Sequence, residues 1–136
     1  MGQTIRPIAL IVDDDKQQRE LIGTLLEEIG LEVIEVASSE EAVNILRMFA
    51  HKIILIVAAM NLPSFMDGPR LAVYAQQWPW IRVVVTSYDE QSAERLPRPA
   101  VGMCEPWLPL NMLIQAEQAM SGARHDMVGR LPKMRY

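Results

Sequence analysis

Residues 53–68, IILIVAAMNLPSFMDG, have the pattern of a buried strand that runs into a polar loop. The first six positions are all Ile, Leu, Val or Ala, which is typical of a strand covered on both faces of a parallel sheet. A second apolar run, Ile8–Val12, is followed at once by three aspartates, whereas the strand that begins at Ile53 ends without an acidic residue. The ends of two such strands can lie side by side at one edge of a sheet, so these residues decide which chemistry is available there.

Hydrophobic patterning in the rest of the chain predicts alternating strands and helices. Five short apolar runs lack strict alternation and are therefore expected to pair in parallel. The predicted strands are Ile8–Val12, Glu32–Val36, Ile53–Ala58, Arg82–Thr86 and Val101–Cys104. Apolar residues at helical spacing predict helices at Lys16–Ile29, Ser39–Ala50, Gly68–Gln77 and Leu110–Met120. With right-handed crossovers, this order predicts an α/β fold with a doubly wound, five-stranded parallel sheet.

Two of the predicted helices carry start signals. Asp15 with Gln18, and Ser38 with Glu41, have the spacing in which a cap oxygen accepts from a free backbone amide. We therefore expect the first two helices to begin directly after Asp15 and Ser38.

Composition excludes several classes of protein. Half of the 136 residues are hydrophobic, which suits a single packed domain. The longest apolar runs are shorter than the roughly 20 residues of a membrane span, and the N-terminus lacks a signal-peptide cleavage site, so we expect a soluble cytoplasmic protein without membrane contact. The single cysteine, Cys104, excludes an internal disulfide, and His51 and His125 are too isolated to form a zinc site with it.

The charge is distributed unevenly along the chain. Residues 122–136 carry four basic side chains against one aspartate, a net charge of +3, whereas the remainder carries −7. An acidic body argues against nucleic-acid binding. We expect the basic tail to be solvated and mobile, or to touch an acidic partner.

The order of these segments resembles the receiver domains of two-component response regulators. The resemblance covers about residues 5–121, which leaves 122–136 as a tail outside the domain. It depends on IVDDD at the first strand end, the NLPSFMDG loop after the third, VVVTSY at the fourth and EPW after the fifth. It implies a flavodoxin-like receiver fold and a place in phosphorelay signal transduction.

The resemblance also implies a phosphoryl site. In the family, two acids after the first strand hold Mg²⁺, and a hydroxyl at the end of the fourth strand binds a phosphoryl oxygen; Asp13, Asp14 and Thr86 match these positions. Paired carboxylates suit a hard cation beside a phosphoryl group. Alternatively, the aspartates only cap a helix, and Thr86 is only a β-branched strand end.

Three further positions depart from the family. The phosphoacceptor aspartate is replaced by Ala59, the lysine that pairs with the phosphoryl group by Glu105, and the aromatic switch residue by Gly102. A methyl group is no nucleophile, and Glu105 would repel a phosphoryl group. We therefore expect no catalytic residue and no cofactor. Any Mg²⁺ binding to Asp13 and Asp14 is expected to be weak, in a vestigial acidic pocket that also contains Thr86 and Glu105.

The link between the fourth and fifth strands is shorter than is usual in the family. Pro97 and Pro99 lie near its end and block helix propagation. We therefore expect the fourth helix to be short or irregular, within about Glu90–Leu96, and the surrounding face to be remodelled. The interface candidates there are Pro106, Trp107 and Leu108.

These departures favour a stand-alone pseudo-receiver that acts through phosphorylation-independent protein contacts. Its partner would be a histidine kinase, another response regulator or a second copy of the chain. One alternative is a receiver phosphorylated at Asp13, Asp14 or Asp67. A further alternative, a small enzyme that uses Glu105 and Asp14 as an acid/base pair, lacks an identifiable substrate group.

Overall fold

The computed structural model describes residues 6–63, 66–87, 95–104 and 109–134, and the side chains of the last range as far as Gly122. Its centre is one sheet of five parallel strands in the order β2-β1-β3-β4-β5. The strands are β1 (Ile8–Val12), β2 (Glu32–Val36), β3 (Ile53–Ala59), β4 (Arg82–Ser87) and β5 (Val101–Cys104). The prediction of a doubly wound parallel sheet is therefore confirmed, with β3 and β4 each one residue longer than expected.

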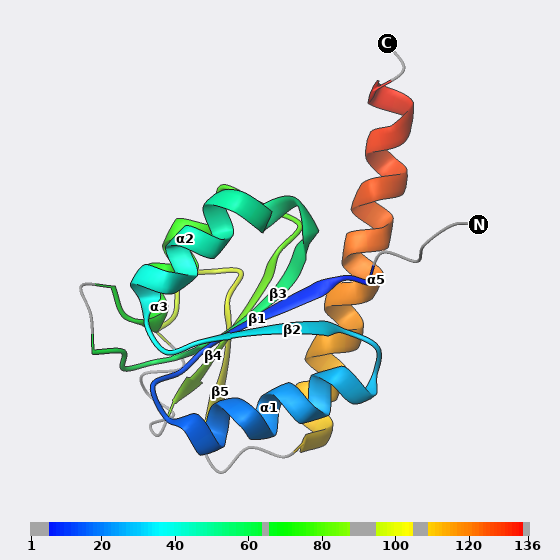
Figure 1. Ribbon diagram of the computed structural model, residues 1–136. Helices are drawn as coiled ribbons and strands as arrows, with labels where there is room; N and C mark the ends of the chain where they lie inside the picture. Colours follow the sequence, from blue (N-terminus) through cyan, green and yellow to red (C-terminus); the bar gives the residue numbers. More distant parts are fainter. Residues whose placement is uncertain (1–5, 64–65, 88–94, 105–108, 135–136) are drawn as a thin grey trace.

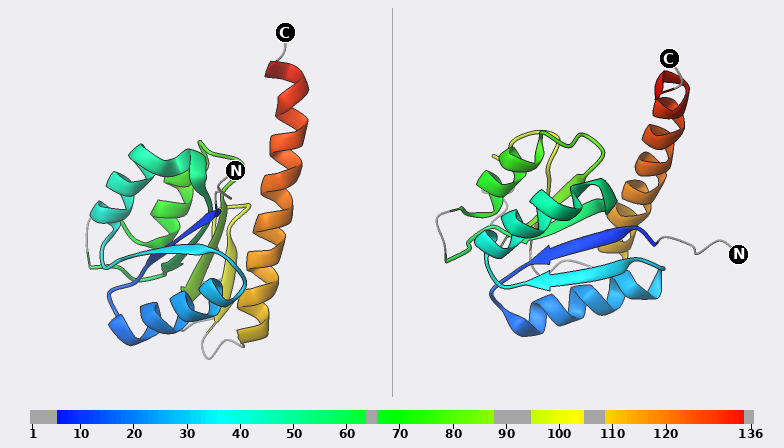
Figure 2. Two further views of the ribbon diagram at one scale, coloured as in Figure 1. Left: turned by 45° about the vertical axis from the view of Figure 1, so that its right-hand side comes forward. Right: turned by 45° about the horizontal axis from the view of Figure 1, so that its top comes forward.

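Helices cover both faces of this sheet (Figure 1). They are α1 (Lys16–Glu28), α2 (Ser39–Phe49), α3 (Gly68–Ala75) and α5 (Pro109–Met134), and a 3-10 turn follows α2 at Ala50–Lys52. Two further views show α2 and α3 on one face and α1 and α5 on the other (Figure 2). Each face has its own apolar core. Leu46 and Leu71 lie in the core beneath α2 and α3, and Leu26 and Met112 lie in the core beneath α1 and α5.

The first two helices begin where the capping pattern predicts. Asp15 Oδ1 accepts from the amides of Gln17 and Gln18, at 3.0 and 3.3 Å. At α2, Ser38 Oγ accepts from the Glu41 amide at 3.3 Å, and Glu41 Oε2 reaches back to the amide of Ala37 at 3.0 Å. Each cap satisfies amides that have no partner inside the helix.

The last helix is longer than the sequence indicated. Its predicted end was Met120, but α5 continues to Met134 and extends beyond the sheet (Figure 1). Gly122 lies inside this longer helix, where a glycine costs only about 1 kcal/mol relative to alanine. The mobility of the basic segment 122–136 stays a prediction.

The predicted fourth helix, about Glu90–Leu96, falls mainly on residues outside those described. Of this range the structure describes only Arg95 and Leu96, and neither is helical. Within the described residues, no helix combines the length and the apolar character needed to cross a membrane.

Candidate functional site

The carboxyl ends of β1, β3 and β4 surround a pocket of about 50 Å³. The parallel register places Val12 opposite Ala58, and Ala59 opposite Thr86, so the residues that follow β1 reach the same edge of the sheet. The pocket is lined by Asp13, Asp14, Asp15, Ala59, Met60, Asn61 and Thr86. The structure thus brings together four of the residues singled out from the sequence, Asp13, Asp14, Ala59 and Thr86.

Asp13 is the buried acid of this pocket, with only 6% of its surface exposed. Its Oδ1 accepts from the Asp15 amide at 2.9 Å, and its carbonyl oxygen accepts from Arg19 Nη1 at 2.6 Å. Burial raises the pKa of Asp13 above its usual value, because the charged form loses contact with water. The negative charges of Asp14 and Asp15 raise this pKa further, whereas the hydrogen bond from the Asp15 amide and the charge of Arg19 oppose the shift.

The neighbouring aspartates have different surroundings. Asp14 is exposed at the rim of the pocket. Asp15 is also exposed, and its carboxylate caps α1 as described above. Asp67 is not part of the pocket lining, and its Oδ1 accepts from the Arg70 amide at 3.0 Å and so caps α3.

Ala59 occupies the position where β3 reaches the pocket. Its register partner Thr86 is buried, and the Thr86 carbonyl accepts from the Met60 amide at 2.7 Å. The start of α3 is held close to this strand end, since the Gly68 amide donates to the Met60 carbonyl at 3.1 Å. A Cβ atom at Gly68 would clash with the carbonyl oxygen of Ala59, so only glycine fits there. Ala59 therefore lines the pocket at a strand end that backbone hydrogen bonds tie to both β4 and α3.

The described residues do not form a complete Mg²⁺ site. No group of three or more His, Cys, Asp or Glu side chains in the described part of the chain is arranged to hold a metal ion. Asp13 Oδ1 already accepts a backbone hydrogen bond, and the third position around the pocket offers the methyl group of Ala59. Mg²⁺ can complete its octahedral shell with water, so the weak binding expected from the sequence stays a prediction.

Several predicted positions lie outside the described residues. They are Glu105 and the interface candidates Pro106, Trp107 and Leu108. Their proximity to the pocket therefore stays a prediction. Gly102 is described, in β5 opposite Val85 of β4, and has no side chain that could act as a switch.

Sequence reasoning missed Arg19, which links the pocket to the edge strand β2. Besides its bond to the Asp13 carbonyl, its Nε lies 3.5 Å from Glu35 Oε1, and only 17% of its side chain is exposed. Gly23 leaves room for this pair, because a Cβ there would lie 3.0 Å from Glu35 Oε2. A basic residue in the second turn of a helix gives no sequence signal of a partner on another strand.

Comparisons with known proteins agree with this geometry. The sequence model of the family described as the response regulator receiver domain matches residues 9–103. No curated protein sequence matches the chain.

Three solved structures with the same fold each share less than a quarter of their residues with this chain. The signal receiver domain of an HD domain-containing protein from Pseudomonas fluorescens Pf-5 is 22% identical, with a TM-score of 0.76 over 93% of this chain and 96% of that one. A response regulator receiver domain protein from Clostridium thermocellum is 20% identical, with a TM-score of 0.73 over 90% and 98%. The signal receiver domain of a signal transduction histidine kinase from Syntrophus aciditrophicus is 23% identical, with a TM-score of 0.73 over 85% and 91%.

Proposed function

The chain belongs to the response regulator receiver domain family of two-component signalling, and we propose that it is a pseudo-receiver that signals without phosphorylation. Its output would be protein contacts with a histidine kinase, another response regulator or a second copy of the chain. A receiver-like fold in a histidine kinase is found in the similar structure from Syntrophus aciditrophicus, which supports a kinase as one class of partner.

The observation that carries this proposal is the methyl group of Ala59 at the carboxyl end of β3. Ala59 lines the pocket together with Asp13, Asp14 and Thr86, where an incoming phosphoryl group would have to be accepted. A carbon side chain has no lone pair with which to attack phosphorus. The absence of a side chain at Gly102 supports the same conclusion, since the rotation of an aromatic group that transmits phosphorylation in the family has no counterpart there.

A second candidate function is phosphorylation at another aspartate, and the geometry favours Asp14. Asp14 is exposed and lines the pocket, so its carboxylate is accessible to a phosphodonor. Asp13 is buried and accepts from the Asp15 amide, and Asp67 is engaged as the cap of α3. Phosphorylation of Asp13 or Asp67 would therefore disrupt a hydrogen bond that the fold uses.

The test is incubation of the intact chain with acetyl phosphate and Mg²⁺, followed by intact-mass spectrometry and by ¹⁹F NMR with beryllofluoride. We expect no mass increase of one phosphoryl group and no protein-bound fluorine signal. A catalytically competent receiver domain treated in parallel provides the positive control.

The Asp14→Asn variant separates the two candidate functions. Stoichiometric labelling of the wild-type chain that disappears in Asp14→Asn would replace the pseudo-receiver proposal with acceptance at Asp14. Labelling that survives in Asp14→Asn but not in Asp13→Asn or Asp67→Asn would assign the acceptor to that residue instead.

A further inference from the structure

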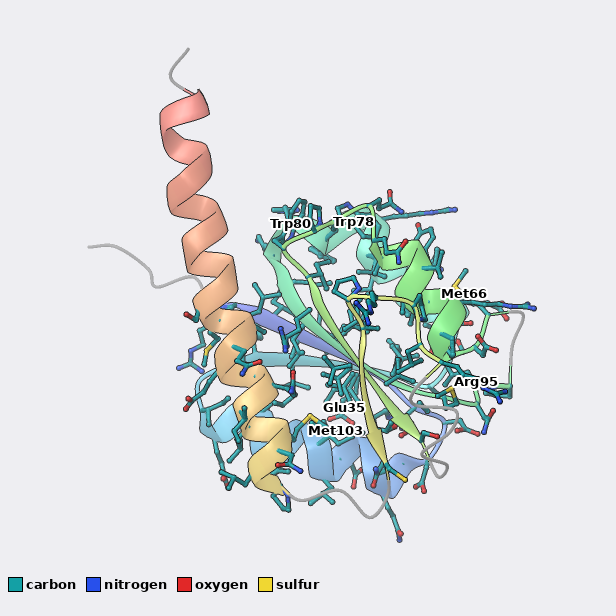
Figure 3. All side chains as sticks on the ribbon, turned by 180° about the vertical axis from the view of Figure 1, so that it is seen from behind. Glu35, Met66, Trp78, Trp80, Arg95 and Met103 are labelled. Carbon is teal, nitrogen blue, oxygen red and sulfur yellow. The ribbon has the colours of Figure 1, made fainter. Side chains whose placement is uncertain are left out.

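A groove of about 320 Å³ lies away from the acidic pocket and shares no lining residue with it. It begins beside Ile81, next to the amino-terminal end of β4, whereas the acidic pocket lies at the carboxyl ends of the strands. Trp78, which lines this groove, and Trp80 lie close together at one end of the molecule in Figure 3. The lining residues are Ala72, Ala75, Gln76, Trp78, Pro79, Ile81, Val83, Arg98, Pro99 and Ala100.

Small side chains create this hollow between two walls. One wall comes from α3 and the link after it, and the other from the segment that precedes β5. Alanines occupy positions 72, 75 and 100, where larger residues would fill the space. Gln76 Nε2 donates to the Arg98 carbonyl oxygen at 2.9 Å and joins the two walls. The two walls are therefore joined by a defined contact between distant parts of the chain.

The lining has the chemistry of a site for a small amphipathic ligand. Most of it is apolar, and Trp78 offers an aromatic ring that is itself held edge-to-face by Tyr74, with ring centroids 5.5 Å apart. Arg98 is the one charged residue in the lining, and no acid balances it there, although the whole chain has a net charge of −4. Arg98 is exposed and makes no ion pair with any residue of the described ranges. A positive charge beside an apolar surface therefore favours a ligand that carries a negative charge on an apolar body.

The volume of the groove limits the size of the ligand. Its volume is at the small end of the range of about 300–1,000 Å³ for ligand pockets, which suits a body of one or two rings rather than a nucleotide. A divalent cation is disfavoured, because the lining contains no carboxylate.

We propose that the groove between α3 and residues 98–100 binds a small aromatic carboxylate, with its ring against Trp78 and its carboxylate paired with Arg98. An arginine suits this role because its guanidinium can donate two parallel hydrogen bonds to one carboxylate. The site does not depend on phosphorylation, since none of its residues belongs to the acidic pocket. A bound ligand would contact both walls and strengthen their connection through Gln76.

The experiment is a titration of the ¹⁵N-labelled intact chain with phenylacetate, followed by amide and indole N–H shifts in NMR spectra. The indole signal of Trp78 is identified with Trp78→Phe. Phenylacetamide serves as the uncharged isostere, and acetate as the anion without a ring. We expect saturable shifts at Trp78, Gln76 and Ala100 with phenylacetate, affinity weaker by about fivefold or more with phenylacetamide, and no saturation with acetate.

Amino-acid substitutions test whether phenylacetate binds in the groove. Arg98→Gln is expected to reduce the affinity for phenylacetate to that for phenylacetamide, whereas Arg47→Gln, an exposed arginine on α2, leaves it unchanged. Ala100→Leu is expected to abolish the shifts at Trp78 by filling the groove, with the melting temperature as the check of folding. Equal affinity for the acid and the amide, shifts confined to residues outside the groove, or no shift at millimolar phenylacetate would each overturn the proposal.

Discussion

Asp13 and Ala59 line the same pocket, but only Asp13 brings a charge that burial disfavours. Asp13 has a carboxylate at a place where burial disfavours its charge, whereas Ala59 lines the same pocket with no ionisable group. The buried acid has a clear structural role, because its Oδ1 accepts from the Asp15 amide and its carbonyl accepts from Arg19. Asp13 thus helps to organise the turn after β1, whatever chemistry the pocket supports.

Replacement of Asp13 with asparagine should stabilise the protein at pH 7. The variant keeps an oxygen that can accept from the Asp15 amide and removes the charge that burial disfavours. Because the folded pKa of Asp13 is raised, its penalty is fully present above that pKa and is lost as the pH falls toward the unfolded value of 3.8. We expect a melting temperature raised by roughly 2–5 °C at pH 7, and a gain that shrinks as the pH approaches 4.

Thermal unfolding followed by circular dichroism between pH 4 and pH 8 checks this prediction. Glu117→Gln, an exposed position on α5, is the control for loss of one negative charge. A gain for Asp13→Asn that is the same at pH 4 and pH 7 would contradict burial of the charge as its cause.

An aspartate at position 59 should make the stability of the chain depend more strongly on Mg²⁺. Ala59→Asp adds a third carboxylate to the pocket that Asp13 and Asp14 already line, so like-charge repulsion should lower the melting temperature at pH 7 without metal. Mg²⁺ at about ten times its dissociation constant would stabilise the variant by about 1.4 kcal/mol. Differential scanning calorimetry with 0 and 10 mM MgCl₂ measures both effects. Ala59→Asn is the neutral control, and the same response to Mg²⁺ in that variant would exclude the added carboxylate as the ligand.

Among the secondary-structure elements, α3 shows most clearly how the sequence positions the pocket. Asp67 caps the helix, and Gly68 lets its first turn approach the end of β3. The Gly68 amide donates to the Met60 carbonyl, so helix and strand end are joined directly behind the pocket. The strand end and α3 therefore form one packed unit, and the loop between them is anchored at both of its ends.

Gly68→Ala should destabilise the protein by about 2 kcal/mol or more, because the added methyl group would clash with the carbonyl oxygen of Ala59 and the backbone must move. Gly122→Ala is the matched control. Gly122 lies within α5 and an added Cβ there meets no atom within 4 Å, so the change should stabilise by up to about 1 kcal/mol through helix propensity. Urea denaturation of both variants measures the difference, and a stabilised Gly68→Ala would show that α3 can move away from β3 at little cost.

For the molecule as a whole, α5 packs on the rest of the fold through residues in its first half. Met112, Ala116 and Ala119 are buried in the core that α5 shares with α1. Arg82, at the start of β4, fixes the same helix from outside that core, since its Nε donates to Gln115 Oε1 at 2.6 Å and its Nη2 donates to Gln118 Oε1 at 2.7 Å. Ala119 is the last buried residue that the structure describes in α5.

A chain that ends at Ser121 should therefore keep the stability of the full chain. We expect a melting temperature within about 2 °C of the full-length value, because substitutions and deletions away from packed groups have small effects. Differential scanning calorimetry of both chains tests this, with a chain that ends at Asn111, and so lacks the buried face of α5, as the destabilised control. A loss of more than about 5 °C on removal of residues 122–136 would place the basic segment within the folded domain.

Local patterns in the sequence predicted the strands, the first two helix starts and the parallel fold, because hydrophobic periodicity and capping depend on residues only a few positions apart. Motif spacing also led to the prediction that Ala59 stands where the family has its phosphoacceptor, and the structure adds that Ala59 lines the pocket beside Asp13 and Thr86.

Features that join distant residues required the three-dimensional structure. The burial of Asp13 and the bond from Arg19 to its carbonyl depend on packing between elements. The groove at Trp78 is the clearest case. Its walls are joined by Gln76 and Arg98, which lie 22 positions apart. Its volume results from small side chains that give no signal in the sequence, because only the fold brings them to one groove.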